Sequence, residues 1–219
     1  MRRLSSILRA VLVGLAVYFC ATPGVADEPH QYEFLMVEPP ASPFSDRWTL
    51  IVDTSSSGQR VFGKTLFAYE EIMRYTTDEF YFSMFSFNNL TYFREWEQVS
   101  PEAIRRNKAW LDDTKGVLSR CTEALTLVFR DPEPHLTIIL VGDGGFTEAC
   151  FNRGFDQVEK IIRDGQDWRV ANGLYPAIIC SVGIENVGYT AGGKPTDRDC
   201  QDFLRHIGAL YHGGYFLVR

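Results

Sequence analysis

The sequence predicts an α/β fold: a doubly wound, mainly parallel sheet of six strands, with one antiparallel edge strand and helices on both faces. Two apolar runs, at 48–52 and 136–141, have the composition of strands that are buried on both faces, and each stops at an aspartate. Segments with apolar residues at helical spacing alternate with the strand-like runs, which is typical of a parallel sheet covered by helices.

The order of the elements follows from the same periodicities. A helix at 61–73 follows the first strand, and the strands at 80–87 and 90–99 form a hairpin through Asn88-Asn89, which gives the antiparallel edge. Ser100-Pro101 begins the first of two short helices before residue 130. After the strand at 136–141 we expect a helix over about 152–168, a strand at 175–182, a helix over about 195–211 and a last strand at 214–218.

The first 26 residues have the features of a secretory signal peptide. Basic residues precede an apolar run at 10–19, and the small residues Gly24 and Ala26 precede a cleavage site before Asp27. The run is shorter than the roughly 20 residues that span a membrane. We therefore expect an extracytoplasmic protein, periplasmic or secreted, without a membrane span after cleavage. An extended N-terminal segment at 27–46 would precede a single domain at 47–219.

The charge of the chain favours a protein partner over nucleic acid. Asp and Glu number 28 against 22 Lys and Arg, a formal net charge of −6, and the leader carries three arginines and no acid. An acidic protein is repelled by nucleic acid and by anionic membranes. We expect neither as a partner.

Polar residues follow both buried strands. Asp53, Ser55 and Ser57 are spaced by two, so that their side chains can point into one cup if the chain leaves the strand nearly extended. Asp143 supplies a second carboxylate from a neighbouring strand, because ligands in open α/β sheets bind at the carboxyl ends of the strands. Such hard oxygen ligands suit Mg²⁺, or alternatively Mn²⁺ or Ca²⁺. The set holds fewer oxygens than the shell of the metal, so a partner's carboxylate can complete it.

The pattern Asp53-Thr54-Ser55-Ser56-Ser57 after an apolar strand is the DxSxS signature of the metal-ion-dependent adhesion site (MIDAS), and residues 47–219 resemble the von Willebrand factor A (VWA) family. The likeness includes the strand-Asp-Gly element at 138–144 and the last helix with its Gly-Gly at 203–214. It implies a Rossmann-like VWA fold.

The family pattern also calls for a hydroxyl residue shortly before an Ala-Leu helix, usually after two glycines, and this sequence departs from it. Ser119, five residues before Ala124, has the expected spacing, and we favour it as the last protein ligand. Thr114 is the alternative if the loop is longer.

Four cysteines remain once the leader is removed, an even number for an oxidising compartment. Their spacing contains no CxxC pair, which argues against a zinc cluster. Of the three possible pairings we favour Cys121 with Cys150, which would brace the metal site, and Cys180 with Cys200.

The site and the resemblance imply an exported adhesion or interaction module in which a MIDAS-bound cation coordinates an Asp or Glu of a partner protein. The alternative is a periplasmic assembly or maturation factor for an exported enzyme or complex. A metal-dependent hydrolase is disfavoured, because Ser55 or Ser57 as nucleophile would need a neighbouring base. We expect no enzymatic activity and no catalytic residue, since the histidines of the predicted domain should lie away from these serines: His135, His206 and His212.

Overall fold

The computed structural model describes residues 32–55, 61–88, 90–116, 120–145, 154–186 and 197–219. The chain divides after Gln31, and residues 32–219 form one compact unit. The predicted signal peptide, Ser57, Ser119 and Cys150 lie outside the described residues. Within the described ranges, no helix is both long and apolar enough to cross a membrane.

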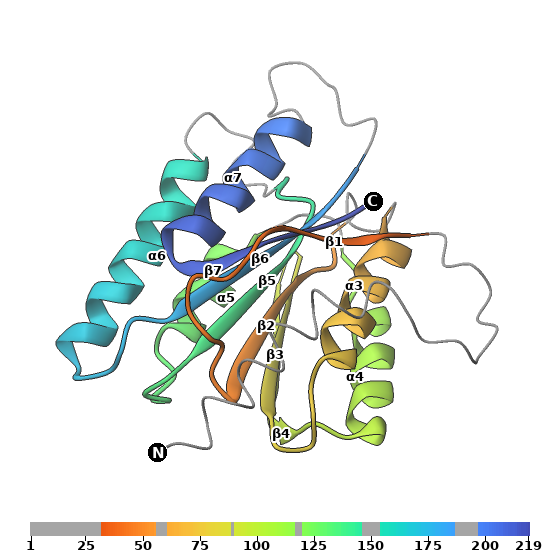
Figure 1. The fold of residues 1–219 in the computed structure, drawn as a ribbon, viewed down its shortest axis with the longest axis horizontal. Helices are drawn as coiled ribbons and strands as arrows, with labels where there is room; N and C mark the ends of the chain where they lie inside the picture. Colours follow the sequence, from red (N-terminus) through yellow and green to blue (C-terminus); the bar gives the residue numbers. More distant parts are fainter. Residues whose placement is uncertain (1–31, 56–60, 89, 117–119, 146–153, 187–196) are drawn as a thin grey trace. The chain divides into compact units, whose positions relative to one another are not determined.

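The described strands form one mixed, mainly parallel sheet (Figure 1). Their order is β1-β7-β6-β5-β2-β3-β4, and pairing is antiparallel only at the two edges, between β1 and β7 and between β3 and β4. The predicted α/β fold is confirmed, with seven strands in place of six. The strands are β1 Phe34–Glu38, β2 Arg47–Asp53, β3 Tyr81–Phe87, β4 Thr91–Gln98, β5 Thr137–Gly142, β6 Ile178–Ile184 and β7 His212–Val218.

The seventh strand, β1, lies within the segment that the sequence predicted as an extended lead-in. Phe34 pairs with Val218 of β7, and its ring stacks on Phe216 with centroids 5.4 Å apart. Pro39 and Pro40 follow the strand directly, and proline cannot donate a hydrogen bond to a ladder. These prolines next to its short apolar run are why the sequence did not predict a strand here.

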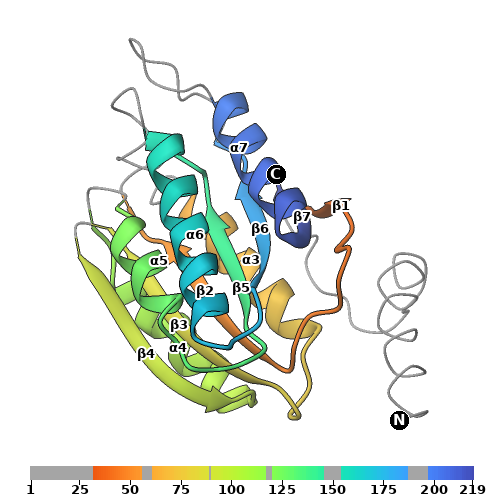
Figure 2. The same ribbon diagram turned by 90° about the vertical axis from the view of Figure 1, so that its left-hand side faces the viewer.

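Helices cover both faces of the sheet, as predicted (Figures 1 and 2). Helices α5, α6 and α7 pack on one face, and α3 and α4 pack on the other. Ser100 caps α4 by accepting a hydrogen bond from the Ala103 amide (3.1 Å). The helices are α3 Phe62–Arg74, α4 Pro101–Asp113, α5 Thr122–Val128, α6 Gly154–Ala171 and α7 Asp197–Leu210.

Alternate residues of each central strand enter two separate cores. In β2, Ile51 packs with α5, α6 and α7, whereas Leu50 and Val52 pack with α3 and α4. Because both faces are covered, the centre of the strand at 50–52 is a continuous apolar run that does not alternate with polar residues.

This alternation contradicts the predicted disulfide between Cys180 and Cys200. Cys180 of β6 lies in the core beneath α3 and α4, whereas its neighbour Ile179 packs on the side of α7, the helix that carries Cys200. Cys180 is a free, buried thiol, and burial raises its pKa. The predicted partner of Cys121, Cys150, is not among the described residues, so that pairing stays a prediction.

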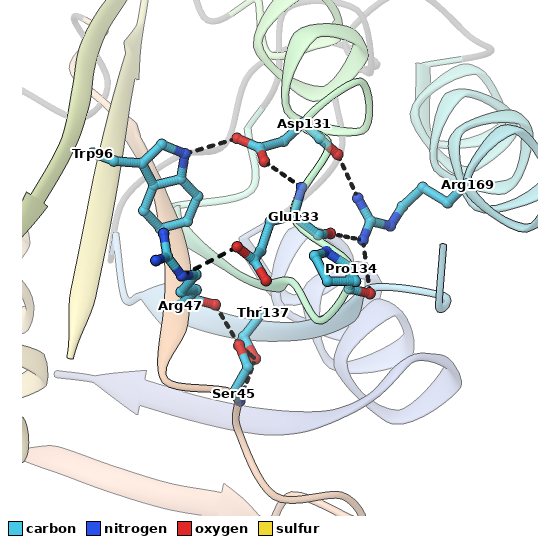
Figure 3. Close-up of polar contacts among 8 residues, drawn as sticks. All are labelled: Ser45, Arg47, Trp96, Asp131, Glu133, Pro134, Thr137 and Arg169. Carbon is cyan, nitrogen blue, oxygen red and sulfur yellow. Dashed lines mark hydrogen bonds and ion pairs between the residues drawn. The ribbon is translucent and has the colours of Figure 1, made fainter. Parts of the chain in front are cut away.

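A buried arginine fixes the end of the sheet where the parallel strands begin (Figure 3). Arg169, near the end of α6, is fully buried and donates to the main-chain carbonyls of Asp131 (3.0 Å), Glu133 (2.6 Å) and Pro134 (3.4 Å). Its Nε donates to the carbonyl of Tyr175 (2.9 Å). One guanidinium therefore closes both the loop before β5 and the turn before β6.

Side chains of the loop before β5 extend this anchor to β2 and β4. Asp131 accepts a hydrogen bond from the indole of Trp96 (2.9 Å), and Glu133 pairs with Arg47 (3.1 Å; Figure 3). The amino ends of the strands are thus occupied by contacts that hold the fold together.

We predict that Arg169→Met lowers the free energy of unfolding by about 3 kcal/mol, because four carbonyls lose their shared donor. Urea unfolding followed by circular dichroism measures the change. Arg105→Met is the matched control: Arg105 is exposed and forms a surface ion pair with Glu102 (2.8 Å), so the midpoint should stay unchanged. Equal midpoints for the two variants would contradict this role of Arg169.

Candidate metal centre

The structure brings Asp53 and Asp143 to the same end of the sheet. Strands β2 and β5 are parallel neighbours with Val52 opposite Val141, so each aspartate follows the last pairs of this ladder. Asp53 is fully buried and Asp143 is 4% exposed. A Cβ atom on Gly142 would lie 2.9 Å from the Cβ of Asp53, so the end of β5 passes directly against the Asp53 side chain.

This is also the place where the order of the strands reverses. From β2 the chain passes through α3 to β3 on one side, and later returns to add β5 on the other side of β2. The loops after β2 and β5 therefore diverge at this point, which is where open α/β sheets bind their ligands.

Ser55 is joined to Asp53 by a local turn. Its backbone amide donates to Oδ1 of Asp53 (2.8 Å), and the serine is 1% exposed. The chain thus bends after β2. This differs from the nearly extended path on which the expected position of the Ser55 side chain was based. The bend results from the tendency of an aspartate to bind the amide two residues ahead. It fixes the first two members of the DxSxS pattern relative to each other.

Both oxygens of the Asp143 carboxylate accept hydrogen bonds from uncharged donors. Oδ1 accepts from the Gly145 amide (2.9 Å), and Oδ2 accepts from Nδ2 of Asn186 (3.0 Å). Between them Gly144 has φ of 74°, and a Cβ there would lie 2.7 Å from the carbonyl oxygen of Cys200. Only glycine fits this turn, which carries Asp143 past the start of α7.

Thr114, the alternative to Ser119, lies at the end of α4 and is 4% exposed. Its hydroxyl accepts from Ser86 (2.7 Å) and donates to the carbonyl of Leu111 (3.2 Å). These bonds use the only proton of the hydroxyl and one of its lone pairs. The arrangement favours a structural role for Thr114, and Ser119 stays the predicted ligand.

Asn88 is a buried residue whose role the sequence analysis missed. Beyond its place in the hairpin turn, its side-chain amide donates to the hydroxyl of Thr54 (3.2 Å) and to the carbonyl of Thr114. Gly116 lies so close that a Cβ there would be 2.2 Å from Cγ of Asn88. Asn88 thereby ties the loop after α4 to the ends of β2 and β3. Its position directly after a buried strand, like that of Asp53, is the signal that could have revealed it.

The described residues contain no group of three or more His, Cys, Asp or Glu that could hold a metal. Of the predicted ligands, the described ones are the carboxylates of Asp53 and Asp143 and the hydroxyl of Ser55, and oxygen donors of this kind suit Mg²⁺ and not zinc. His135 and His212 precede or begin β5 and β7, at the other end of the parallel strands.

No protein-family model and no curated protein matches the chain. Among solved structures, the pilus adhesin SpaC from Lactobacillus rhamnosus GG is 10% identical with a TM-score of 0.51, over 82% of this chain and 30% of the adhesin. An aerotolerance-related membrane protein from Bacteroides fragilis is 14% identical with a TM-score of 0.49, over 77% of this chain and 89% of that protein. A von Willebrand factor type A structure from Catenulispora acidiphila is 13% identical with a TM-score of 0.46, over 81% and 48%.

At such low identity, the similarity to SpaC shows a shared fold and does not extend to function.

We predict that Asn88→Ala lowers the free energy of unfolding by about 2 kcal/mol, because Thr54 and the carbonyl of Thr114 lose a buried donor. Urea unfolding measures this change, and hydrogen exchange should also show faster exchange at the Gly116 amide, which donates to the carbonyl of Thr54 (3.0 Å). Asn172→Ala removes a comparable amide bond at the exposed end of α6 and should leave Gly116 unaffected. Unchanged exchange at Gly116 in Asn88→Ala would contradict the account.

Proposed function

We propose that this protein is an exported interaction module of the VWA type, in which a divalent cation at the end of the sheet binds a carboxylate of a partner protein. The observation that carries the proposal is the burial of Asp53 and Asp143 at the ends of two adjacent parallel strands. The proposed ligands are Asp53, Ser55, Ser57, Ser119 and Asp143, and the proposed metal is Mg²⁺, with Mn²⁺ or Ca²⁺ as alternatives.

The chemistry of the described donors fits a hard cation. A buried carboxylate is costly unless its charge is compensated. Among the described residues no Lys or Arg forms an ion pair with Asp143, and its hydrogen-bond donors are an amide side chain and a backbone amide. A bound cation would compensate this charge and supply an open coordination position for an incoming carboxylate.

Described residues hold part of this end of the sheet in place before any ligand arrives. Asp53 fixes the turn to Ser55, and hydrogen bonds among Asn88, Thr54 and Thr114 join the ends of β2 and β3 to the end of α4. Ligands that are already ordered lose little conformational entropy on binding, which favours affinity.

The proposed module binds its partner and catalyses no reaction. His135 stacks on Tyr175 with ring centroids 4.3 Å apart, before β5, and His206 lies 3.8 Å from Glu159 on the side of α6. These positions support the inference that neither acts as a base for Ser55. The proposed export rests on the N-terminal sequence.

We predict that Mg²⁺ binds the chelator-treated protein at one site, and that Asp53→Ala and Asp143→Ala each weaken binding by about 2 kcal/mol or more, roughly 30-fold. Isothermal titration calorimetry measures the affinity. Asp164→Ala is the matched control, because Asp164 is an exposed acid on α6 that pairs with Lys160 and should not alter binding. No binding by the folded wild type, or equal binding by all variants, would refute the proposed site.

The same variants test the partner. Immobilised wild-type protein should retain its partner protein in a buffer that contains Mg²⁺ and release it when chelator is added. Immobilised Asp53→Ala should not retain the partner. Retention that is independent of both the metal and Asp53 would show that partner binding uses another surface.

A further inference from the structure

The contact between Asn186 and Asp143 joins two segments that are far apart in the sequence. Asn186 follows β6, is 7% exposed, and donates from Nδ2 to Oδ2 of Asp143 (3.0 Å). Since the Gly145 amide donates to the other oxygen, the two bonds together fix the rotation of the carboxylate. Each oxygen keeps one further lone pair.

The segment that carries Asn186 is itself held on three sides. The Glu185 amide donates to the carbonyl of Val218 (2.8 Å), and its carbonyl accepts from Nζ of Lys64 on α3 (2.9 Å). The carbonyl of Ile184 accepts from the side chain of Gln201 on α7 (3.0 Å). The side chain of Asn186 is therefore presented to Asp143 by a segment that hydrogen bonds connect to β7, α3 and α7.

Gln201 also links this turn to the backbone of Asp143. Its Nε2 lies 3.4 Å from the carbonyl oxygen of Asp143, and its Oε1 accepts from the Tyr215 hydroxyl (2.6 Å). A Cβ on Gly183 would lie 2.0 Å from Oε1 of Gln201, so glycine at this position makes room for the amide. Asp143 is thus oriented at its carboxylate by Asn186 and at its carbonyl by Gln201.

We propose that Asn186 is a positioning residue of the metal site: its amide orients the Asp143 carboxylate for the cation without neutralising it. A Lys or Arg at this place would orient the carboxylate equally well but would compete with the metal for its charge. An amide supplies the same directed hydrogen bond with no net charge. Partners of this kind, behind the ligands, commonly account for 10- to 100-fold in metal affinity. The inference rests on the proposed function, because it assigns a role toward the same cation.

The test uses Asn186→Ala, with Asn172→Ala as the matched control at the far end of α6. Hydrogen exchange of the Gly145 amide in metal-free protein reports the orientation of the carboxylate, since that amide donates to Oδ1 of Asp143. Calorimetry with Mg²⁺ reports the affinity. In Asn186→Ala we expect exchange at Gly145 about tenfold faster and Mg²⁺ affinity about tenfold weaker, with core amides such as Leu140 still protected. Asn172→Ala should change neither.

The outcomes separate this inference from the proposed function. Unchanged exchange at Gly145 in Asn186→Ala overturns the positioning role whether or not metal binds. Faster exchange with wild-type Mg²⁺ affinity overturns the role toward the metal and leaves the site intact. Absence of Mg²⁺ binding in the wild type overturns the proposed function and, with it, the role of Asn186 toward a cation. Faster exchange together with weaker affinity, both confined to Asn186→Ala, supports the proposal.

Discussion

The parallel pairing of β2 with β5 is the constraint on which the rest of the candidate site depends. The register sets Val52 opposite Val141, so this ladder ends at the same level in both strands. A buried aspartate follows in each: Asp53 after Val52, and Asp143 after Gly142. Two carboxylates in such a place repel each other and are poorly solvated. The surrounding structure supplies hydrogen bonds to Asp143 from neutral amides, which orient the charge but do not cancel it. This is the basis on which we propose a hard cation as the ligand.

The two ends of the sheet have different tasks. At the amino ends of the parallel strands, Arg169 satisfies four main-chain carbonyls and ties two connections together. At the carboxyl ends, the side chains of Asn88 and Asn186 form hydrogen bonds between segments that follow different strands. The contacts at the amino ends stabilise the fold. The carboxyl ends can therefore carry carboxylates and hydroxyls, which contribute little to packing.

The sequence was sufficient to predict the α/β architecture and the placement of Asp53 and Asp143 at the same end of the sheet, because both follow from buried strands that stop at an acid. It did not reveal β1, whose apolar run lies next to prolines. Nor did it reveal that Cys180 faces α3 and α4 and not α7, because that depends on which residues of β6 point to each face of the sheet. Asn186 and Gln201 could not be predicted either. Asn186 and Gln201 contact Asp143 although they lie 43 and 58 residues after it in the sequence, respectively. Such contacts are set by tertiary packing and not by a local sequence pattern.

The most direct test of the central claim is paramagnetic broadening of backbone amide signals by Mn²⁺, measured by nuclear magnetic resonance at substoichiometric metal. The account predicts that Ser55 and Gly145 lose intensity first, that Gly173 beyond the end of α6 is unaffected, and that Asp53→Ala removes the effect. Broadening spread over the acidic helices, or centred away from the ends of β2 and β5, would contradict a cation held between Asp53 and Asp143.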